Sequence, residues 1–401
     1  MFNQNNSNNN IKAADGRLFN EEIYKKYNQV GIKIPHILLP NEKVDMCRFA
    51  CIAADQFSYD KKYWDDIKNY VGDSPSAYKM MFPEAYMPIK NVDIENINKT
   101  MYDYLSNNVL CDIGEGFIYV KRKTSTGIRQ GLMVALDLNE YDYNKNSKSL
   151  IRPTEGTVED RLPIRVEIRE NASLDMPHVM VLINDKKNNL MNYLDSIIIN
   201  NKPVYDFDLM MDGGHIEGYK IDKEENINKI ANIFFNLKNE LSDNLMFAIG
   251  DGNHSLAAAK ICYEKNKNEH KRYALVEVVN IYDEALEFYP IHRLLMNVDK
   301  KDFIEKTGID INDNNLDLQI VQKKIDEYIK SHKNVVLEYM HDKNECIKRG
   351  KLDDNLSITF GDFNKDGFFD NIIKYGTLCR KTFSMGHAKD KRYYLETMSL
   401  I

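Results

Sequence analysis

LMFAIGDGNHSLAAAK, residues Leu245 to Lys260, is the part of the chain whose local structure is easiest to predict. The apolar run Leu245–Ile249 has the length of a buried strand. Gly250 and Gly252 follow it, and glycine permits a positive φ or a close approach of the backbone. The alanine-rich segment 254–264 has high helix propensity. We therefore predict a strand, a tight turn and a helix.

Polar side chains gather at this turn, on Asp251, Asn253, His254 and Ser255. The first N–H groups of a helix lack partners within it and carry partial positive charge, so the turn suits a phosphate or another anion. The pattern is neither a Walker-type loop nor GxGxxG. Asn253 or Ser255 would serve equally well as a helix cap. These residues alone leave a functional and a structural interpretation open.

Composition narrows the class of protein. The 401 residues predict two or three domains or one elaborated domain, and the 43% of hydrophobic residues suffice for a large core. A net charge of −7 argues against non-specific binding of nucleic acid. We find no 18-residue apolar stretch and no signal peptide, and so expect neither membrane insertion nor export. Six cysteines without a CxxC pair indicate reduced thiols and a cytoplasmic protein.

Hydrophobic periodicity predicts an α+β chain. We expect a disordered Asn-rich tail at residues 1–15, an α+β core with a helical N-terminal part at 16–296, and a smaller α+β region packed on the core at 297–401. Strands are predicted at Phe117–Lys123, Gln130–Leu138, Val179–Ile183, Tyr205–Met211, His215–Ile221, Tyr273–Ile281, Val335–His341 and Leu356–Phe360. Helices are predicted at Leu162–Asn171, Glu224–Leu241 and Leu316–His332. Trp64 is predicted to lie in the core.

Three polar segments have both a structural and a functional interpretation. Residues 152–165 are dense in charge, as solvated loops usually are, yet they contain the groups of a substrate loop in Glu155, Thr157, Glu159, Arg161 and Arg165. His292 and Arg293 interrupt an apolar run, which is more typical of a packed pair than of catalytic groups, although such groups need partners or a ligand. The cationic cluster 389–392 is either a phosphate clamp or a solvated surface.

Four of these stretches together resemble the motifs of one family. PTEGTVEDR (153–161) resembles Pro-His-Glu-Arg-Thr…Glu-Asp-Arg, DGNHS (251–255) resembles Asp-Gly-His-His-Arg, PIHR (290–293) resembles Pro-Thr-His-Arg, and residues 381–393 resemble a conserved tail. The family is large, bacterial and archaeal, and is known as a domain of unknown function. Its Asp-Gly-His-His-Arg element is similar to that of free serine kinases with the ParB/sulfiredoxin-like fold.

The resemblance implies a ParB/sulfiredoxin-like mixed-sheet core and a nucleotide-dependent phosphotransferase. The implied acceptor is a small hydroxyl metabolite, with free L-serine, converted to O-phosphoserine, as the specific expectation. ATP or ADP and Mg²⁺ are the implied cofactors, and a homodimer is left open.

The resemblance also assigns roles to residues. The implied catalytic groups are Glu155, as the base, with His254 and His292. The implied ligands of phosphate or nucleotide are Gly250, Asp251, Gly252, Asn253, Ser255, Arg293, Lys391 and Arg392. Thr157 and Arg161 would bind substrate, and Asp251 would bind the metal.

This chain departs from the family motifs at four positions. Asn253 and Ser255 replace a His and an Arg, and Thr154 and Gly156 replace the His and the Arg that flank the glutamate. The lost positive charge favours an alternative, a nucleotide-binding regulatory protein or slow NTPase of the same fold without kinase activity. A third alternative is an enzyme that acts on an oxidised cysteine, by analogy with sulfiredoxin.

Overall fold

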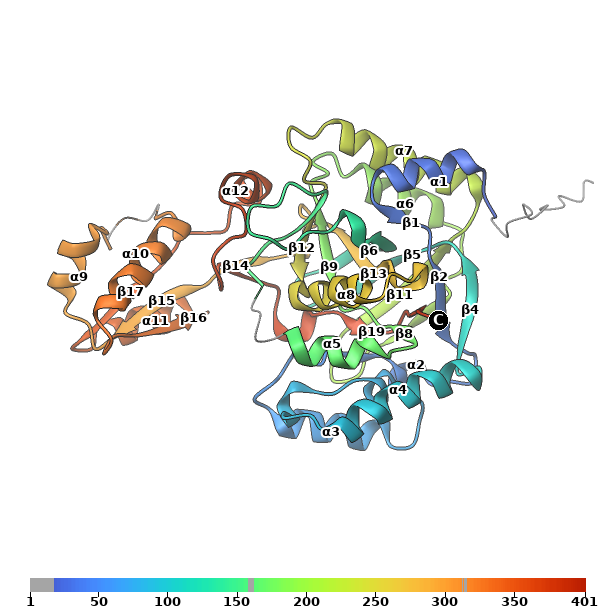
Figure 1. Cartoon of the computed structure of the whole chain (residues 1–401), viewed down its shortest axis with the longest axis horizontal. Coiled ribbons are helices and arrows are strands. Elements are labelled where there is room, and N and C mark those ends of the chain that lie inside the picture. Colours follow the sequence, from blue (N-terminus) through green and yellow to red (C-terminus); the bar gives the residue numbers. More distant parts are fainter. Residues whose placement is uncertain (1–17, 158–161, 312, 314–315) are drawn as a thin grey trace, which may run out of the picture.

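Within residues 18–157, 162–311, 313 and 316–401, which the computed structural model describes, a mixed nine-stranded sheet forms the centre of the fold (Figure 1). Its strands are, in order, β10 (Tyr205–Asp208), β11 (His215–Ile221), β5 (Phe117–Lys123), β6 (Ile128–Asp137), β13 (Tyr273–Asn280), β9 (Met180–Ile183), β12 (Phe247–Asp251) and β7 (Ile151–Pro153), with β1 (Ile32–Lys33) paired to β6. The pairs β13–β9 and β12–β7 are parallel, and the others are antiparallel. The predicted α+β class and mixed sheet are confirmed. The predicted tail at 1–15 lies outside the described residues.

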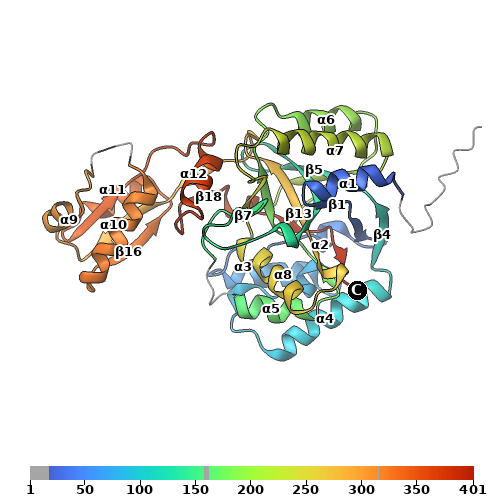
Figure 2. The same ribbon diagram turned by 45° about the horizontal axis from the view of Figure 1, so that its top comes forward.

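Helices cover both faces of this sheet (Figures 1 and 2). On one side lie α1 (Glu21–Gln29), α6 (Asn189–Ile198) and α7 (Glu224–Asn239), and on the other α2 (Met46–Phe49), α3 (Lys61–Val71) and α4 (Asn91–Ser106). Side chains alternate along β5, so that Phe117 and Tyr119 pack against the first layer whereas Ile118 and Val120 pack against the second. The sheet is therefore apolar on both faces. At one edge α5 (Leu162–Glu170) packs on α8 (Asn253–Lys265).

The N-terminal region is less helical than the sequence indicated. Short strands lie between its helices, namely β1, β2 (His36–Pro40) and β3 (Cys51–Ile52), and β2 pairs with β4 (Leu110–Glu115). Trp64 on α3 is fully buried, as predicted. The predicted strand and helix around Gly250 are present as β12 and α8, shifted by one or two residues. No helix in the described part of the chain is long and apolar enough to cross a membrane.

Residues 292–360 form a small unit beside the main body, drawn in orange in Figure 1. Its sheet has β15 (His292–Met296) between β16 (Val336–Met340) and β17 (Asn355–Ile358), with helices α9 (Lys300–Thr307), α10 (Leu318–Ser331) and α11 (Lys343–Gly350). Leu295, Phe303, Ile325 and Ile358 are fully buried in a core of its own.

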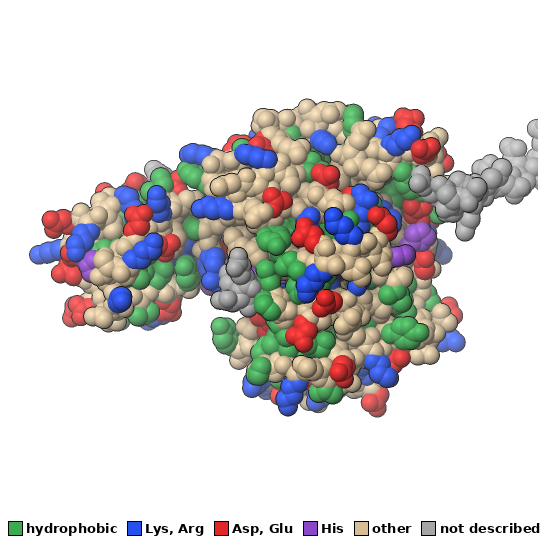
Figure 3. Space-filling view, viewed as in Figure 1, with side chains coloured by type: hydrophobic (Ala, Val, Ile, Leu, Met, Phe, Trp, Pro, Cys, Tyr) green, Lys and Arg blue, Asp and Glu red, His purple; other side chains and the backbone are tan. Residues whose placement is uncertain are grey.

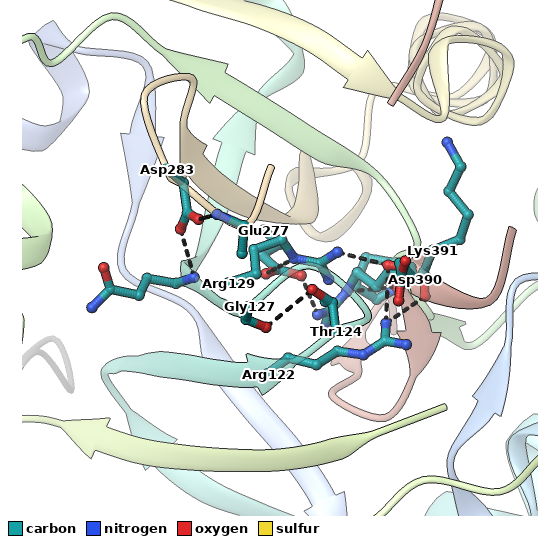
Figure 4. Close-up of polar contacts among 12 residues, drawn as sticks. Arg122, Thr124, Gly127, Arg129, Glu277, Asp283, Asp390 and Lys391 are labelled. Carbon is teal, nitrogen blue, oxygen red and sulfur yellow. Dashed lines mark hydrogen bonds and ion pairs between the residues drawn. The ribbon is translucent and has the colours of Figure 1, made fainter. Parts of the chain in front are cut away.

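After the small unit the chain returns to the main body through α12 (Phe368–Tyr375). Strand β18 (Phe383–Met385) pairs with β14 (Phe288–Pro290), β19 (Tyr393–Tyr394) pairs with β3, and β20 (Met398–Ser399) pairs with β8 (Leu174–Asp175). This returning segment carries Arg392, which is buried and donates to Glu277 Oε2 at 2.6 Å and to Glu396. Arg129 Nε lies 3.6 Å from Glu277 Oε1. Glu277 is thus the buried counter-ion that joins the central strand β13 to the returning segment (Figure 4).

Replacing Glu277 by Gln tests this junction. The substitution removes the negative charge but leaves the buried guanidinium groups of Arg129 and Arg392, and losing one partner of a buried ion pair costs about 3–5 kcal/mol. Urea unfolding of Glu277→Gln should show a loss of that order. The matched control is Glu338→Gln, since Glu338 pairs with Arg349 where both side chains are about one-third exposed, and this change should cost less than about 1 kcal/mol. Equal losses in the two variants would contradict the assignment.

Candidate functional site

The turn between β12 and α8 is a place of close backbone approach. Gly252 has φ +83°, and a Cβ there would lie 2.9 Å from Val179 Cγ2 and 3.1 Å from Val179 Cα. A Cβ at Gly250 would lie 3.0 Å from Leu182 Cγ and from Met385 Sδ. Glycine is required at Gly252 by conformation and by space. Gly252 is also the N-cap of the 13-residue helix α8, so the turn leads directly into the helix N-terminus.

Asn253 ties this turn to the neighbouring strand β7. Its Oδ1 accepts from the Thr154 backbone N at 3.3 Å, and its Nδ2 donates to Thr154 Oγ1 at 3.4 Å. The Thr154 hydroxyl in turn donates to the Ile249 carbonyl at 2.6 Å, and Thr154 is fully buried. Asn253 therefore holds the residue next to Glu155 against the turn.

Glu155 lies where β7 meets the returning segment. It forms a parallel bridge with Leu378, and the Thr382 N–H donates to its carboxylate. Burial raises the pKa of the Glu155 carboxyl, and Lys381, the Thr382 N–H and Arg380 offset this only in part. Lys381 has φ +58°, which is rare for a residue with a side chain and is a strain often found at functional sites.

Asp251 lies close enough to Glu155 to raise the pKa of that carboxyl further. Its Oδ2 is 3.1 Å from Lys391 Nζ, and its Oδ1 accepts from the Gly252 N–H at 3.0 Å. The Asp251 and Lys391 side chains are 19% and 14% exposed, so the pair is only partly screened by water.

Two buried arginines fix the backbone that carries Lys391 (Figure 4). Arg122 donates to the carbonyls of Lys389 at 2.8 Å, Asp390 at 3.3 Å and Lys391 at 2.5 Å, and Arg129 donates to the Asp390 carbonyl at 2.7 Å. Burial, followed by the charge of Arg129, lowers the pKa of Arg122 to about 9. The predicted cationic cluster 389–392 is therefore divided, since the Lys391 side chain reaches the turn whereas Arg392 is buried in the fold.

Ser255 connects the other side of the turn to residues that the sequence analysis missed. Its Oγ lies 3.2 Å from His178 Nε2, and His178 Nδ1 lies 2.9 Å from the Tyr394 hydroxyl. Burial opposes ionisation of nearby Asp55, but His178, Gln56 and Lys391 outweigh burial and lower the pKa of its carboxyl. Asp55, His178 and Tyr394 are far apart in sequence, and no local pattern marks them.

The structure does not bring His292 and Arg293 to the turn. Both belong to the small unit, where His292 Nδ1 accepts from the Phe360 N–H at 3.2 Å. Arg293 Nε donates to Gln322 Oε1 at 2.5 Å, and the guanidinium lies 4.7 Å from the centre of the Tyr339 ring. Both side chains therefore have protein partners where they lie.

The remaining predicted residues are placed as follows. His254 is the second residue of α8 and is partly buried. The Thr157 hydroxyl is buried and has no hydrogen-bond partner among the described residues. Arg161 lies outside the described residues.

Among the described residues, no group of three or more His, Cys, Asp or Glu side chains is arranged so that it could hold a metal ion. Mg²⁺ is often held by one or two carboxylates together with phosphate oxygens. The single carboxylate of Asp251 fits that pattern, whereas a cage made only of protein ligands does not.

Comparison of the sequence with models of known protein families identifies the family of this chain. Residues 36–398 match the model of the family described as "Protein of unknown function (DUF1015)". This chain belongs to that family. No curated protein matches the sequence.

Solved structures give distant matches. A free serine kinase in complex with AMP is 11% identical, with a TM-score of 0.35, over 67% of this chain and 92% of that one. A variant of free serine kinase in complex with ADP has a TM-score of 0.36 at the same identity and coverage. A conserved hypothetical protein from Pyrococcus furiosus is 12% identical, with a TM-score of 0.33, over 67% of this chain and 95% of that one.

Gly252→Ala should lower the free energy of unfolding by more than the cost of placing alanine at a positive φ. A left-handed conformation costs a residue with a side chain about 1–2 kcal/mol, and the new Cβ would also collide with Val179. The control is Gly308→Ala, where φ is +61° but the nearest atom, Lys324 Nζ, is 4.0 Å away. We expect urea unfolding to show a larger loss at Gly252. Equal losses would mean that close packing at the turn is unimportant.

His292 should make stability depend on pH. Burial, followed by the positive charges of Lys343 and Arg293, lowers the pKa of His292 from 6.5 to about 4. Between these values the unfolded chain binds a proton that the folded protein does not, so stability falls as pH falls, by up to about 3 kcal/mol. His292→Asn, which keeps a hydrogen-bond acceptor for Phe360, should flatten the curve between pH 6.5 and 4 and leave it parallel to the wild type above pH 7.5. Equal slopes in the acid range would contradict this assignment.

Proposed function

We propose that the protein is a nucleotide-dependent phosphotransferase that acts on a small hydroxyl metabolite and has a ParB/sulfiredoxin-like core. Free L-serine is the first acceptor to test. One observation carries the proposal: Glu155, a carboxyl of raised pKa, lies beside Asp251 and Lys381 at the turn that opens α8. The motif resemblance described above independently assigns the same glutamate as base.

Phosphate binding would use backbone and cations together. The N–H groups at the start of α8 and the helix dipole favour an anion. Lys391 supplies positive charge beside Asp251, and Lys381 supplies it beside Glu155. Phosphoryl transfer depends mainly on such positioning and charge neutralisation. In the proposed arrangement Lys391 exchanges its contact with Asp251 for a phosphate oxygen.

Glu155 would act as general base. Its carboxylate accepts the proton of the acceptor hydroxyl while the acceptor oxygen bonds to the terminal phosphorus, and the bond from that phosphorus to the nucleotide's bridging oxygen breaks. A carboxyl of raised pKa is a stronger base than an exposed one, which suits this task. When bound, Mg²⁺ would neutralise phosphate charge, and Asp251, released from Lys391, would be its protein ligand.

One observation favours the alternative of a nucleotide-binding regulatory protein or slow NTPase. Asn253 and Ser255, which replace a His and an Arg of the motif, are engaged with Thr154 and His178. They hold the turn in place and add no positive charge to it. Binding without transfer is therefore the second candidate function.

Glu155→Gln should separate transfer from binding. We expect acceptor phosphorylation to fall by about 10²–10⁴-fold, because the general base is lost, and nucleotide affinity measured by calorimetry to remain unchanged. Because the pKa of Glu155 is raised above its unfolded value of 4.5, its favourable contribution to stability is present at low pH and lost as pH rises. The neutral variant should therefore gain stability relative to the wild type above pH 4.5.

Glu264→Gln is the matched control. Glu264 is about half exposed on α8 and forms an ion pair with Lys260 across one helical turn, so turnover should be unchanged. Wild-type turnover in Glu155→Gln would show that the base is assigned wrongly. Nucleotide binding by the wild type without phosphorylation of L-serine or other small alcohols would favour the regulatory protein.

A further inference from the structure

An apolar cavity of about 160 Å³ lies between α5, α8 and the segment 80–101, and Ser255, at the start of α8, is one of its lining residues. Its walls include Met80, Met101, Ile168, Ala258 and Ala259. Figure 3 shows apolar side chains gathered around α5 and α8 on this face. An apolar cavity of about 150 Å³ accommodates a benzene ring, so a planar ring fits here.

One end of this cavity is polar and borders the start of α8. Asp55, His178, Ser255 and Tyr394 line it. Ser255 is the third residue of α8, so a ligand at this end also touches the helix N-terminus. Lys391 lies near enough to Asp55 to lower the pKa of its carboxyl, and the same lysine pairs with Asp251. Lys391 therefore marks a path from the polar end of the cavity to Asp251 at the turn.

The chemistry changes along that path. Most of the cavity walls are apolar, and the charged side chains among them are paired, Arg165 with Glu84 and Arg169 with Asp175. These walls suit an uncharged ring, whereas the helix start and the lysines beyond it suit an anion. Three carboxylates line the cavity, and Glu84 and Asp175 are paired with arginines. The third, Asp55, accepts a hydrogen bond from Gln56 Nε2 at 3.0 Å, and a carboxylate can only accept hydrogen bonds. It would pair with an amino group and repel a carbonyl oxygen.

We propose that the cavity receives the base of the nucleotide and that the base carries an exocyclic amino group, as adenine does. The phosphates then cross the N-terminus of α8, and the terminal phosphate reaches Lys381 and Glu155. This inference rests on the proposed function, and it adds a base site formed by α5, α8 and Asp55.

Ile168→Trp tests the cavity. Ile168 is a partly buried wall residue on α5, and the larger ring would occupy the space of the base. The matched control is Ile261→Trp, the same change at a partly buried position on α8 outside the cavity. Calorimetry should show that Ile168→Trp weakens ATP binding at least about tenfold, a loss of about 1.4 kcal/mol, and leaves pyrophosphate binding unchanged. Ile261→Trp should change neither.

Asp55→Asn tests the amino group without changing the volume of the site. The wild type should prefer ATP to ITP, whose base has a carbonyl oxygen in place of the amino group, and the variant should lose that preference because an amide can donate. An unchanged preference would overturn the role of Asp55 and with it the proposed base class.

The remaining outcomes separate the two proposals. If Ile168→Trp binds ATP as the wild type does, or raises only the KM of the acceptor, the cavity does not hold the base although the phosphotransferase proposal stands. Equal loss of ATP and pyrophosphate binding would also overturn the base site. If the wild type binds neither ligand, the proposed function fails.

Discussion

The buried charge of Glu277 is the interaction on which the rest of the structure depends. It sits on the central strand β13 and neutralises Arg392 and Arg129, which are too deeply buried to be hydrated. Arg129, together with Arg122, then holds the backbone of residues 389–391. Without the carboxylate, Arg129 would lose its ion-pair partner, Arg392 would keep only Glu396, and the strand pairings of the returning segment would have to hold an excess of buried positive charge. Lys391 and Tyr394, which lie on that segment, owe their positions to that carboxylate.

This arrangement separates the groups that hold the site from the groups that would act in it. Arg122, Arg129 and Arg392 have all their contacts inside the protein. Glu155 and Lys381 are in energetically unfavourable states. Burial disfavours the charged form of the Glu155 carboxyl, and Lys381 has a left-handed backbone conformation. Strain of this kind persists where the surrounding fold is rigid enough to impose it. In the candidate site, the buried arginines hold the surrounding backbone in place, whereas Glu155 and Lys381 carry the unfavourable energy.

The sequence predicted those parts of the structure that depend on neighbouring residues. The strand, glycine turn and helix around Gly250 follow from apolar run length, glycine and alanine, and the paired strands β5 and β6 follow from their alternation. Helix α6 was missed, although Leu190, Met191 and Leu194 form a buried stripe, because asparagines interrupt the pattern. Residues 152–165 were predicted as a loop, either solvated or substrate-binding, yet the first two of them belong to the buried strand β7. The arginine in that strand is buried against Asp243, a partner 91 residues away.

In the candidate site too, the sequence predicted only the residues that lie near one another in the chain or match a motif. Asp251, Asn253 and Ser255 were found because they share one turn, and Glu155 was found through the motif resemblance. Asp55, His178 and Tyr394 meet only because β3 pairs with β19, an event between residues more than 300 positions apart. No pattern local to any one of them carries that information. The same holds for the cavity, whose walls come from segments distant in the sequence.

The return of residues 383–394 to the main body has a consequence for synthesis on the ribosome. Domains generally fold as units while the chain emerges, and the small unit at 292–360 has its own core. The main body cannot be completed in that order, because β19 supplies a strand partner for β3 and Lys391 supplies a cation to the turn. Until residue 394 has emerged, the nascent protein has a central sheet without the groups that complete its candidate site. Chains released early would therefore lack a complete candidate site and would leave apolar surface open to chaperones and proteases.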